Sequence, residues 1–253
     1  DAGEPHPRLE LAAGVGHQDL GLLRIALDLL PQAVDVGLQR VRGDAGIVAP
    51  DLVQKLVAPD GPVAGADKSG LSMTVEEVLH EPERPVRYVA VQALPKGDRA
   101  EQAVEMLTEL GVDEIVPWQA ERSVVRWAPD RVERGLTRWR ATAREASKQC
   151  RRFRVPTVST PMTTAELALR IAQTDLTVVL HETARTRLGA ITLPPIGEIM
   201  FIVGPEGGLS DAEVAAFTAA GGRTALIADA VLRTSTAGVV ALAQLQALAV
   251  RDR

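Results

Sequence analysis

Apolar runs alternate with amphipathic stretches along the last two thirds of the chain. The run VRYVAVQAL at 86–94 predicts a buried strand, and the apolar spacing in DRAEQAVEMLTEL at 98–110 predicts a helix that ends at Gly111. The same patterns predict strands at 112–118, 176–180, 199–203 and 224–228, and helices at 131–150, 164–173, from 211 and at 235–249. Strands separated by helices of this length need crossover connections. Residues 86–253 are therefore expected to form one α/β domain, with a mainly parallel sheet of about five strands covered on both faces.

The first eighty residues carry a weaker pattern. Leu, Ile and Val occur at mixed spacing in DLGLLRIALDLLPQAVDVGLQRV, and LSMTVEEVL at 71–79 is compatible with a strand or a short helix. No aromatic residue precedes Tyr88, so a core in this part must be aliphatic. Pro82 and Pro85 disfavour a helix between the two parts. We therefore expect a small separate domain at 1–80, a linker at 81–85 and the α/β domain at 86–253.

The composition is that of an ordinary globular protein. Of the 253 residues, 46% are apolar and 24% are charged, which is enough apolar material for a core. No apolar run approaches the ~20 residues that span a bilayer, and the N-terminus lacks the basic and then apolar order of a secretory signal. Cys150 is the only cysteine, so an intrachain disulfide is excluded. This fits a reducing compartment, and we expect a cytoplasmic location with Cys150 in a structural role.

Positive charge is concentrated in one segment. The net charge of −5 argues against nucleic-acid binding over the whole surface. The segment RVERGLTRWRATAREASKQCRRFR at 131–154, however, contains nine Lys or Arg residues and only two acidic ones. Such a tract is either a solvated helix face or one side that meets a polyanion. Trp139 inside the tract is a candidate stacking surface and Phe153 lies beside three arginines, which keeps RNA open as the partner.

The strand predicted at 199–203 ends in a glycine-rich turn, within FIVGPEGGLSDAEV at 201–214. Turns of this kind between a strand and a helix hold several classes of ligand. A P-loop needs Lys and then Ser or Thr after its last glycine, and Gly208 is followed by Leu-Ser, which excludes that class. A dinucleotide site has Asp229 in its favour as a ribose ligand, but the glycine spacing differs and Glu206 would face a pyrophosphate. An NAD-dependent enzyme is therefore a distant alternative.

The remaining ligand is S-adenosylmethionine, which carries a sulfonium but no phosphate. Glycines permit close backbone approach to its adenosine, and a nearby carboxylate suits its positive charge. The turn also has a purely structural interpretation, because Ser210 and Glu213 form a capping box that starts a helix in any case, and Gly221 ends that helix. This interpretation leaves the glycines of the turn itself unexplained.

Four ordered motifs resemble one protein family. VGPEGGLSDAEV is followed some twenty residues later by VLRTSTAGVVAL at 231–242, and upstream lie the segments 92–127, 138–158 and VVLHE at 178–182. Together they are similar to the RsmE family, SPOUT-class methyltransferases that methylate N3 of a uridine in 16S ribosomal RNA. The resemblance covers about residues 86–250. It implies S-adenosylmethionine as cofactor, a trefoil knot in the C-terminal domain, a PUA-like N-terminal β-barrel, which the first 80 residues match poorly, and a homodimer that acts on small-subunit ribosomal RNA.

The resemblance also implies a set of cofactor residues in three loops. Transferred onto this sequence, they are Leu180, His181 and Glu182 in the first loop, Gly204, Pro205, Glu206, Gly207 and Gly208 in the second, and Ile227, Ala228, Leu232, Arg233, Thr234, Thr236 and Ala237 in the third. Ser235 stands where the family usually has a glutamate, so a role for that carboxylate is not transferred. Ile227-Ala228 stands where the family usually has Leu-Gly, and this replacement should preserve the backbone contacts to adenine. The hydroxyls at 234–236 are also candidate caps for the last helix.

Methyl transfer from a sulfonium depends mainly on the positions of donor and acceptor. N3 of uracil carries a proton and lies on the Watson–Crick edge, so the base must be unpaired or flipped and the proton must leave. Arg233, whose charge could stabilise a uracil anion, and Glu206 are the candidate catalytic residues. The predicted RNA contacts, which position the substrate, are Lys96, Arg99, Arg122, Arg138, Trp139, Arg144, Lys148, Arg151 and Arg152.

Two further interpretations concern single positions. Because Ser235 replaces a carboxylate of the family, a non-catalytic RNA-binding protein is the alternative function. LHETAR at 180–185 lacks the second histidine of an HExxH zinc motif, since position 185 is an arginine. The sequence therefore predicts no metal site.

Overall fold

The computed structural model describes residues 22–25, 58–60, 63–67, 70–74, 77–79, 84–152 and 154–251. By its contacts the chain divides into two units, Asp1–Pro82 with Arg151–Arg154, and Glu83–Cys150 with Val155–Arg253. The predicted boundaries at 80 and 86, like the linker at 81–85, lie partly outside the described residues and stay predictions.

The described segments of the first unit before residue 80 are short strands. They are β1 (Leu22–Ile25), β2 (Ala58–Asp60), β3 (Val63–Asp67), β4 (Gly70–Thr74) and β5 (Glu77–Leu79). All pairings among them are antiparallel, in a sheet of order β1-β4-β3 and a ribbon of β2 with β5. The described residues of the stretch 71–79, which the sequence left open between strand and helix, are therefore strand at 71–74 and 77–79. The PUA-like barrel stays a prediction.

The second unit is built on a six-stranded sheet of order β11-β9-β10-β6-β7-β8. Its strands are β6 (Val86–Ala93), β7 (Glu114–Trp118), β8 (Thr157–Val158), β9 (Leu176–Leu180), β10 (Gly197–Val203) and β11 (Arg223–Ala225). Every neighbouring pair is parallel. The expected parallel α/β domain is confirmed. The sequence pattern missed the two-residue strand β8, and it placed the start of β11 one residue late and its end three residues late.

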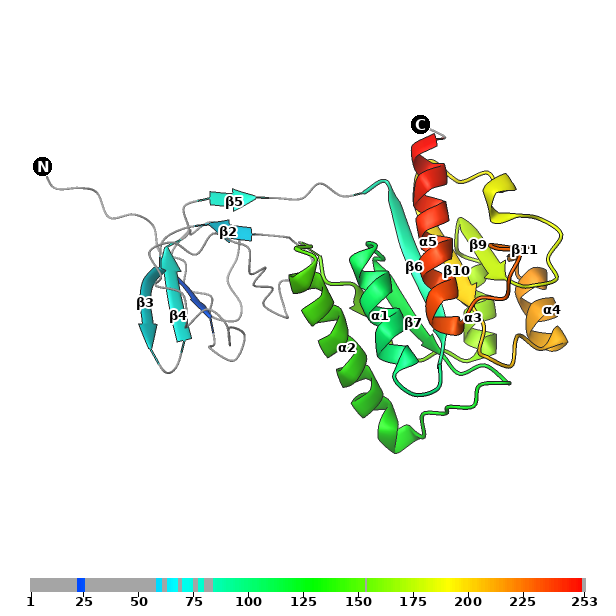
Figure 1. Ribbon diagram of the computed structural model, residues 1–253, viewed down its shortest axis with the longest axis horizontal. Helices are drawn as coiled ribbons and strands as arrows, with labels where there is room; N and C mark the ends of the chain where they lie inside the picture. Colours follow the sequence, from blue (N-terminus) through cyan, green and yellow to red (C-terminus); the bar gives the residue numbers. More distant parts are fainter. Residues whose placement is uncertain are drawn as a thin grey trace, which may run out of the picture. The chain divides into compact units, whose positions relative to one another are not determined.

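Five α-helices and two 3-10 turns connect the strands within the described part of this unit. They are α1 (Arg99–Glu109), η3 (Pro129–Arg131), α2 (Val132–Gln149), α3 (Thr164–Ile171), η4 (Leu188–Ala190), α4 (Asp211–Ala219) and α5 (Thr234–Arg251). Figure 1 shows α1, α2 and α5 on one side of the sheet and α3 with α4 on the other. None of the described helices combines the length and apolar character that crossing a bilayer requires.

Alternating side chains of the strands fill a core on each face of the sheet. In β6, Tyr88 and Ala90 lie in the core beneath α1, α2 and α5, whereas Val89 and Val91 lie in the core beneath α3 and α4. Both sets are buried, which explains why the strand is a continuous apolar run in the sequence. Two layers of helices thus hold the sheet rigid and leave its carboxyl edge for loops.

The chain changes direction across the sheet between β6 and β10. From β6 it proceeds to β7 and β8, and it then returns to form β9, β10 and β11 on the other side. The loops that leave β6 and β10 therefore diverge at the carboxyl edge. Ligands of open parallel sheets bind at such a switch point, and the glycine-rich turn follows β10 directly.

The opposite, amino edge is closed by an ion cluster. The carboxylate of Glu114, at the start of β7, accepts a bidentate pair from Arg170 of α3 at 2.8 and 2.9 Å, and it also accepts from Ser159 and Arg87. Both arginines reach on to Glu198 of β10. Burial would raise the pKa of Glu114, but the hydrogen bonds from Arg170, Ser159 and Arg87 outweigh it and lower the pKa to about 2.

Candidate cofactor site

The three predicted cofactor loops lie at one edge of the sheet. Leu180, His181 and Glu182 follow β9, Gly204–Gly208 follow β10, and 227–237 follow β11 and lead into α5. Because β11, β9 and β10 are parallel neighbours, their carboxyl ends meet. The amide of His181 donates to the carbonyl of Ala225 at 3.1 Å and so joins the first loop to the end of β11, after which the third loop begins. The fold thus brings together segments that are far apart in sequence.

Close backbone approach explains two glycines of the second loop. Gly208 has φ +71°, in the left-handed region, and its amide donates to the carbonyl of Pro205 at 2.9 Å to close the turn. A Cβ at Gly207 would lie 3.1 Å from Cβ and 3.2 Å from the carbonyl oxygen of Arg122. These positions are therefore glycine because the turn is tight and another loop lies against it.

The other loop at Gly207 is the one that follows β7. Nη1 of Arg122 donates to the carbonyl oxygens of Gly207 at 3.4 Å and Leu209 at 3.1 Å. The sequence placed Arg122 among the RNA contacts, and the structure shows it bound to the glycine-rich turn. Its guanidinium therefore holds the turn in place, although the residue is exposed.

Glu206, a candidate catalytic residue, is bound to the loop that follows β6. One carboxylate oxygen accepts from the amide of Lys96 at 3.1 Å and lies 3.8 Å from Nη1 of Arg99. Lys96 and Arg99 were predicted as RNA contacts, and the structure brings both to the turn. This carboxylate thus joins the turn to a cationic loop at the switch point of the sheet.

The third loop leads into α5, and the start of this helix lies against the buried side chain of Gln92. Thr234 and Ser235 are 5% and 3% exposed, and the Nε2 of Gln92 in β6 lies 3.5 Å from the carbonyl of Thr234 and 3.1 Å from that of Ala93. Gln92 is fully buried, and its Oε1 has no partner among the described residues. The candidate catalytic residue Arg233 is exposed, and its carbonyl accepts hydrogen bonds from the amides of Thr236 and Ala237 in the first turn of α5.

Gln92 was missed as a functional residue. The signal was present, because it is a polar residue within the apolar run VRYVAVQAL that predicts β6. A fully buried side-chain amide needs partners, and those of Gln92 belong to the cofactor edge.

The donor set of these loops fits S-adenosylmethionine. The backbone groups of Ala228 and Leu232 form no hydrogen bond with the described part of the protein, so they remain available to an adenine edge. Glu182 and Glu206 are exposed carboxylates beside the turn, and they suit a sulfonium better than a phosphate. The described residues contain no group of three His, Cys, Asp or Glu side chains placed to hold a metal ion.

The remaining predicted RNA contacts lie on α2 and just after its end. Arg138 pairs with Glu101 of α1 at 2.7 Å, and Lys148 pairs with Glu145 at 2.9 Å, so both lie along α2. Arg144 is half-buried on the same helix. Arg151 and Arg152 belong by their contacts to the first unit of the chain.

The prediction for Trp139 is wrong in one respect. Its indole is 1% exposed and meets Trp127 edge to face, with ring centroids 5.3 Å apart at 75°. The residue lies on the face of α2 that packs into the core, together with Leu136 and Ala143. The ring therefore offers no open face on which a base could lie, because the helical period turns position 139 inward while its charged neighbours point outward.

Comparisons with known proteins point to the same kind of site. A family model described as "RNA methyltransferase domain" matches residues 82–246. "Ribosomal RNA small subunit methyltransferase E" of Mycobacterium bovis is 40% identical over 234 residues, which cover 85% of this chain and 88% of that protein. The protein of the same name from Bacillus subtilis is 33% identical over 178 residues, covering 67% and 69%. A Legionella pneumophila structure in complex with the bound cofactor SAM is similar with a TM-score of 0.74, at 25% identity, over 92% of this chain and 94% of that one.

The likeness confirms the SPOUT-type α/β fold class expected from the motifs. The trefoil knot, the homodimer and the cytoplasmic location stay predictions.

Proposed function

The chain belongs to the RNA methyltransferase family and, within it, to the ribosomal RNA small subunit methyltransferases E, and on that premise we propose that it methylates N3 of a uridine in small-subunit (16S) ribosomal RNA. It is an S-adenosylmethionine-dependent ribosomal RNA methyltransferase. What we propose beyond this is the site of methylation, namely that the base is a uridine and that the methylated atom is its N3. The observation that carries it is the convergence of the three predicted cofactor loops at the carboxyl edge, beside the cations Lys96 and Arg99.

The protein would hold the cofactor mainly through backbone groups of the three loops. Bound there, S-adenosylmethionine supplies a methyl group on a positively charged sulfur. The free peptide groups of Ala228 and Leu232 bind and orient the adenine, and the glycine-rich turn excludes side chains from the adenosine. Gln92 fixes the carbonyl of Thr234 at the end of the third loop, and Arg122 fixes the carbonyl of Gly207 in the glycine-rich turn. The protein thus contributes position more than reactivity.

The acceptor base must lose a proton when N3 is methylated. The base is unpaired or flipped so that its Watson–Crick edge is accessible. Arg233, exposed at the start of α5, stabilises the negative charge that develops on uracil. Glu206 is the second candidate, and its contacts with the Lys96 amide and Arg99 fix it at the edge.

One departure supports a second candidate function. Ser235 is buried and carries no carboxylate, whereas the resembling family usually has a glutamate at this place. If that carboxylate is needed for turnover, the chain binds RNA and cofactor without transferring methyl.

Exposed small apolar residues on α5 support the proposed homodimer. Ala243, Ala247 and Val250 are exposed, with Val250 at 74%, and helices of a monomer place polar residues at such positions. Sedimentation of the full chain should give twice the monomer mass, and Ala247→Glu should halve it. A monomeric wild-type chain would remove the dimer from the proposal.

Tritium transfer from methyl-labelled S-adenosylmethionine to small subunits of a strain that lacks the modification tests the function. We expect label in one uridine and a reverse-transcription stop there, because an N3 methyl group blocks Watson–Crick pairing. Label without a stop would place the methyl group on another atom. Calorimetric binding of S-adenosylhomocysteine without any transfer would favour the non-catalytic alternative.

A further inference from the structure

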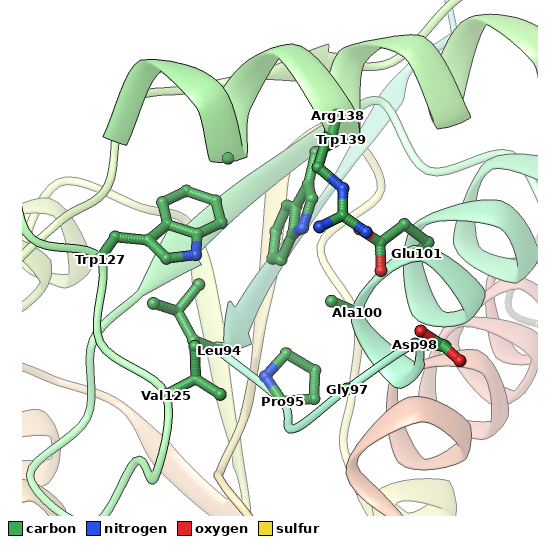
Figure 2. A pocket seen from close by; sticks show the side chains of 11 residues that line it. Leu94, Pro95, Gly97, Asp98, Ala100, Glu101, Val125, Trp127, Arg138 and Trp139 are labelled. Atoms are coloured by element: carbon green, nitrogen blue, oxygen red, sulfur yellow. The ribbon is translucent and has the colours of Figure 1, made fainter. Parts of the chain in front are cut away.

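A cavity of about 260 Å³ opens beside the β6–α1 loop, and none of the three predicted cofactor loops contributes to its lining. The residues around it come from the end of β6, the start of α1, the loop after β7 and the first half of α2 (Figure 2). All of these belong to the second unit of the chain. The cavity is therefore a place in the molecule that the cofactor site does not use.

The walls of the cavity are apolar and partly aromatic. Leu94, Val125 and Trp127 lie close together on one side, and Pro95 and Trp139 also line the cavity (Figure 2). A Cβ at Gly135 of α2 would lie 2.6 Å from the Trp127 ring, so the glycine allows the indole to lie directly against the helix. Trp127 is only half-buried, unlike Trp139, and it presents apolar surface to the cavity.

Charged groups stand only at the rim. Arg138 and Glu101 form an ion pair of 2.7 Å across it, with side chains 62% and 25% exposed (Figure 2). Asp98, which caps α1 without a side-chain bond to the helix, adds an exposed carboxylate. The rim thus offers two groups that accept hydrogen bonds and one that donates them.

A second, more open depression of about 530 Å³ adjoins the cavity and is cationic. It shares Gly97 and Asp98 with the cavity, and its other lining residues are Lys96, Arg99 and Gln102. The amide of Lys96 is bound to Glu206 of the glycine-rich turn. Cavity, cationic depression and cofactor turn therefore follow one another along the β6–α1 loop.

We propose that the cavity receives an unpaired RNA base close to the nucleotide that is methylated, while the phosphate backbone passes over Lys96 and Arg99. This rests on the proposed function, which supplies the RNA. The volume lies just under the ~300 Å³ of the smallest drug-sized sites and suits one ring system rather than a whole nucleotide. Aromatic and apolar walls bind a base through its faces, and the cations bind its phosphates.

The rim further selects the kind of base. Adenine, cytosine and guanine carry exocyclic amino groups that donate to Asp98 or Glu101, whereas uracil has only the single N–H of N3 to donate. The rim therefore favours an amino-bearing base over uracil, so the base in the cavity differs from the uridine that accepts the methyl group.

Ala100→Phe tests the proposal, because the Ala100 methyl group lines the cavity and a phenyl ring there would fill it. Ala215→Phe, at an exposed alanine of α4, is the matched control. In the full-length protein, we expect Ala100→Phe to weaken binding of a small-subunit ribosomal RNA fragment about tenfold. Calorimetric affinity for S-adenosylhomocysteine and the melting temperature should stay at wild-type values in both variants.

Glu101→Gln is the second variant, since it keeps the shape of the rim and removes one acceptor carboxylate. It should reduce the preference for oligo(A) and oligo(C) over oligo(U), measured by quenching of tryptophan fluorescence, which Trp127 reports from the cavity wall. If Ala100→Phe proves unstable, this preference alone decides the matter.

The outcomes separate the cavity from the methyl transfer. Wild-type RNA affinity in Ala100→Phe, with unchanged base preference in Glu101→Gln, would overturn the inference while tritium transfer by the wild type still upholds the proposed function. If the wild type transfers no methyl group but its fluorescence is quenched by RNA and less so in Ala100→Phe, the cavity is upheld and the proposed function fails.

Discussion

The amino and carboxyl edges of the six-stranded sheet, where its strands begin and end, differ in how their polar groups are paired. At the amino edge, Glu114 and Glu198 are joined to Arg87 and Arg170, and each charged group has partners of the opposite sign. At the carboxyl edge, by contrast, the backbone groups of Ala228 and Leu232 have no partner among the described residues, and neither has the buried oxygen of the Gln92 side-chain amide.

The difference shows where stability and binding reside. A satisfied ion cluster fixes the ends of β6, β7 and β10 relative to α3, and changes there should affect unfolding and not ligands. An edge with unsatisfied polar groups gains its partners from a ligand. Changes at the carboxyl edge should therefore affect affinity and leave unfolding nearly unchanged.

Glu114→Ala should have the largest effect. It leaves Arg170 half-buried without its bidentate partner, and removing one member of a buried pair lowers the free energy of unfolding by about 3–5 kcal/mol. Urea unfolding measures this, and S-adenosylhomocysteine affinity should not change. Glu145→Ala breaks an exposed pair with Lys148 and is the control, with an expected loss within about 0.5 kcal/mol. Equal losses in the two variants would mean that the ion cluster stabilises the fold no more than an exposed ion pair does.

Acid should act through the same residue. Because the pKa of Glu114 is lowered from 4.5 to about 2 in the folded state, the unfolded chain binds the proton more tightly. Stability from this group is complete above the unfolded pKa and is lost as the pH falls from about 4.5 through 2, by roughly 3 kcal/mol. Unfolding free energies of wild type and Glu114→Ala should therefore converge over this range. Parallel curves would contradict the assignment.

Gly207→Val should separate the carboxyl edge from the amino edge. A branched side chain cannot fit 3.1 Å from Cβ of Arg122, so the turn must move, and we expect S-adenosylhomocysteine to bind about a hundredfold more weakly. The free energy of unfolding should change by less than about 1 kcal/mol, because the residue is exposed. Gly189→Val, where nothing lies within 4 Å, is the control. Unchanged affinity in Gly207→Val would remove this glycine from the site.

Arg122→Lys should have the smallest effect of these. Lysine keeps the charge but cannot reproduce the guanidinium geometry toward the carbonyls of Gly207 and Leu209, so cofactor affinity should fall about fivefold. RNA affinity, which depends on the charge, should change by less than twofold. The reverse pattern would return Arg122 to the RNA contacts and away from the turn.

Local patterns predicted most of the second unit. The apolar run of β6 and the capping box at Ser210 fix their elements through neighbours within a few residues, and both are as expected. The ligand loops followed from the parallel sheet together with the family resemblance. The two-residue strand β8 was missed because a pair of residues carries no periodic signal.

Contacts between distant segments escaped prediction. Glu114, Arg170 and Glu198 meet only after three strands and a helix are in place, and nothing in their local sequence marks them as partners. The same holds for Arg122, whose partners lie 85 and 87 residues further along the chain. Trp139 was misjudged because a charged tract hides the inward stripe of its helix.

The glycine-rich turn is attached to two loops, through the backbone amide of Lys96 to Glu206 and through the guanidinium of Arg122 to Gly207. Both residues also carry a positively charged side chain that attracts phosphates, so RNA that binds these side chains and shifts either loop changes the energy of the turn. Thermodynamic linkage then requires reciprocity: whatever factor the cofactor applies to RNA affinity, RNA applies to cofactor affinity. Because both loops contact the same turn, the binding of RNA and the binding of the cofactor can each change the affinity for the other without any change of fold.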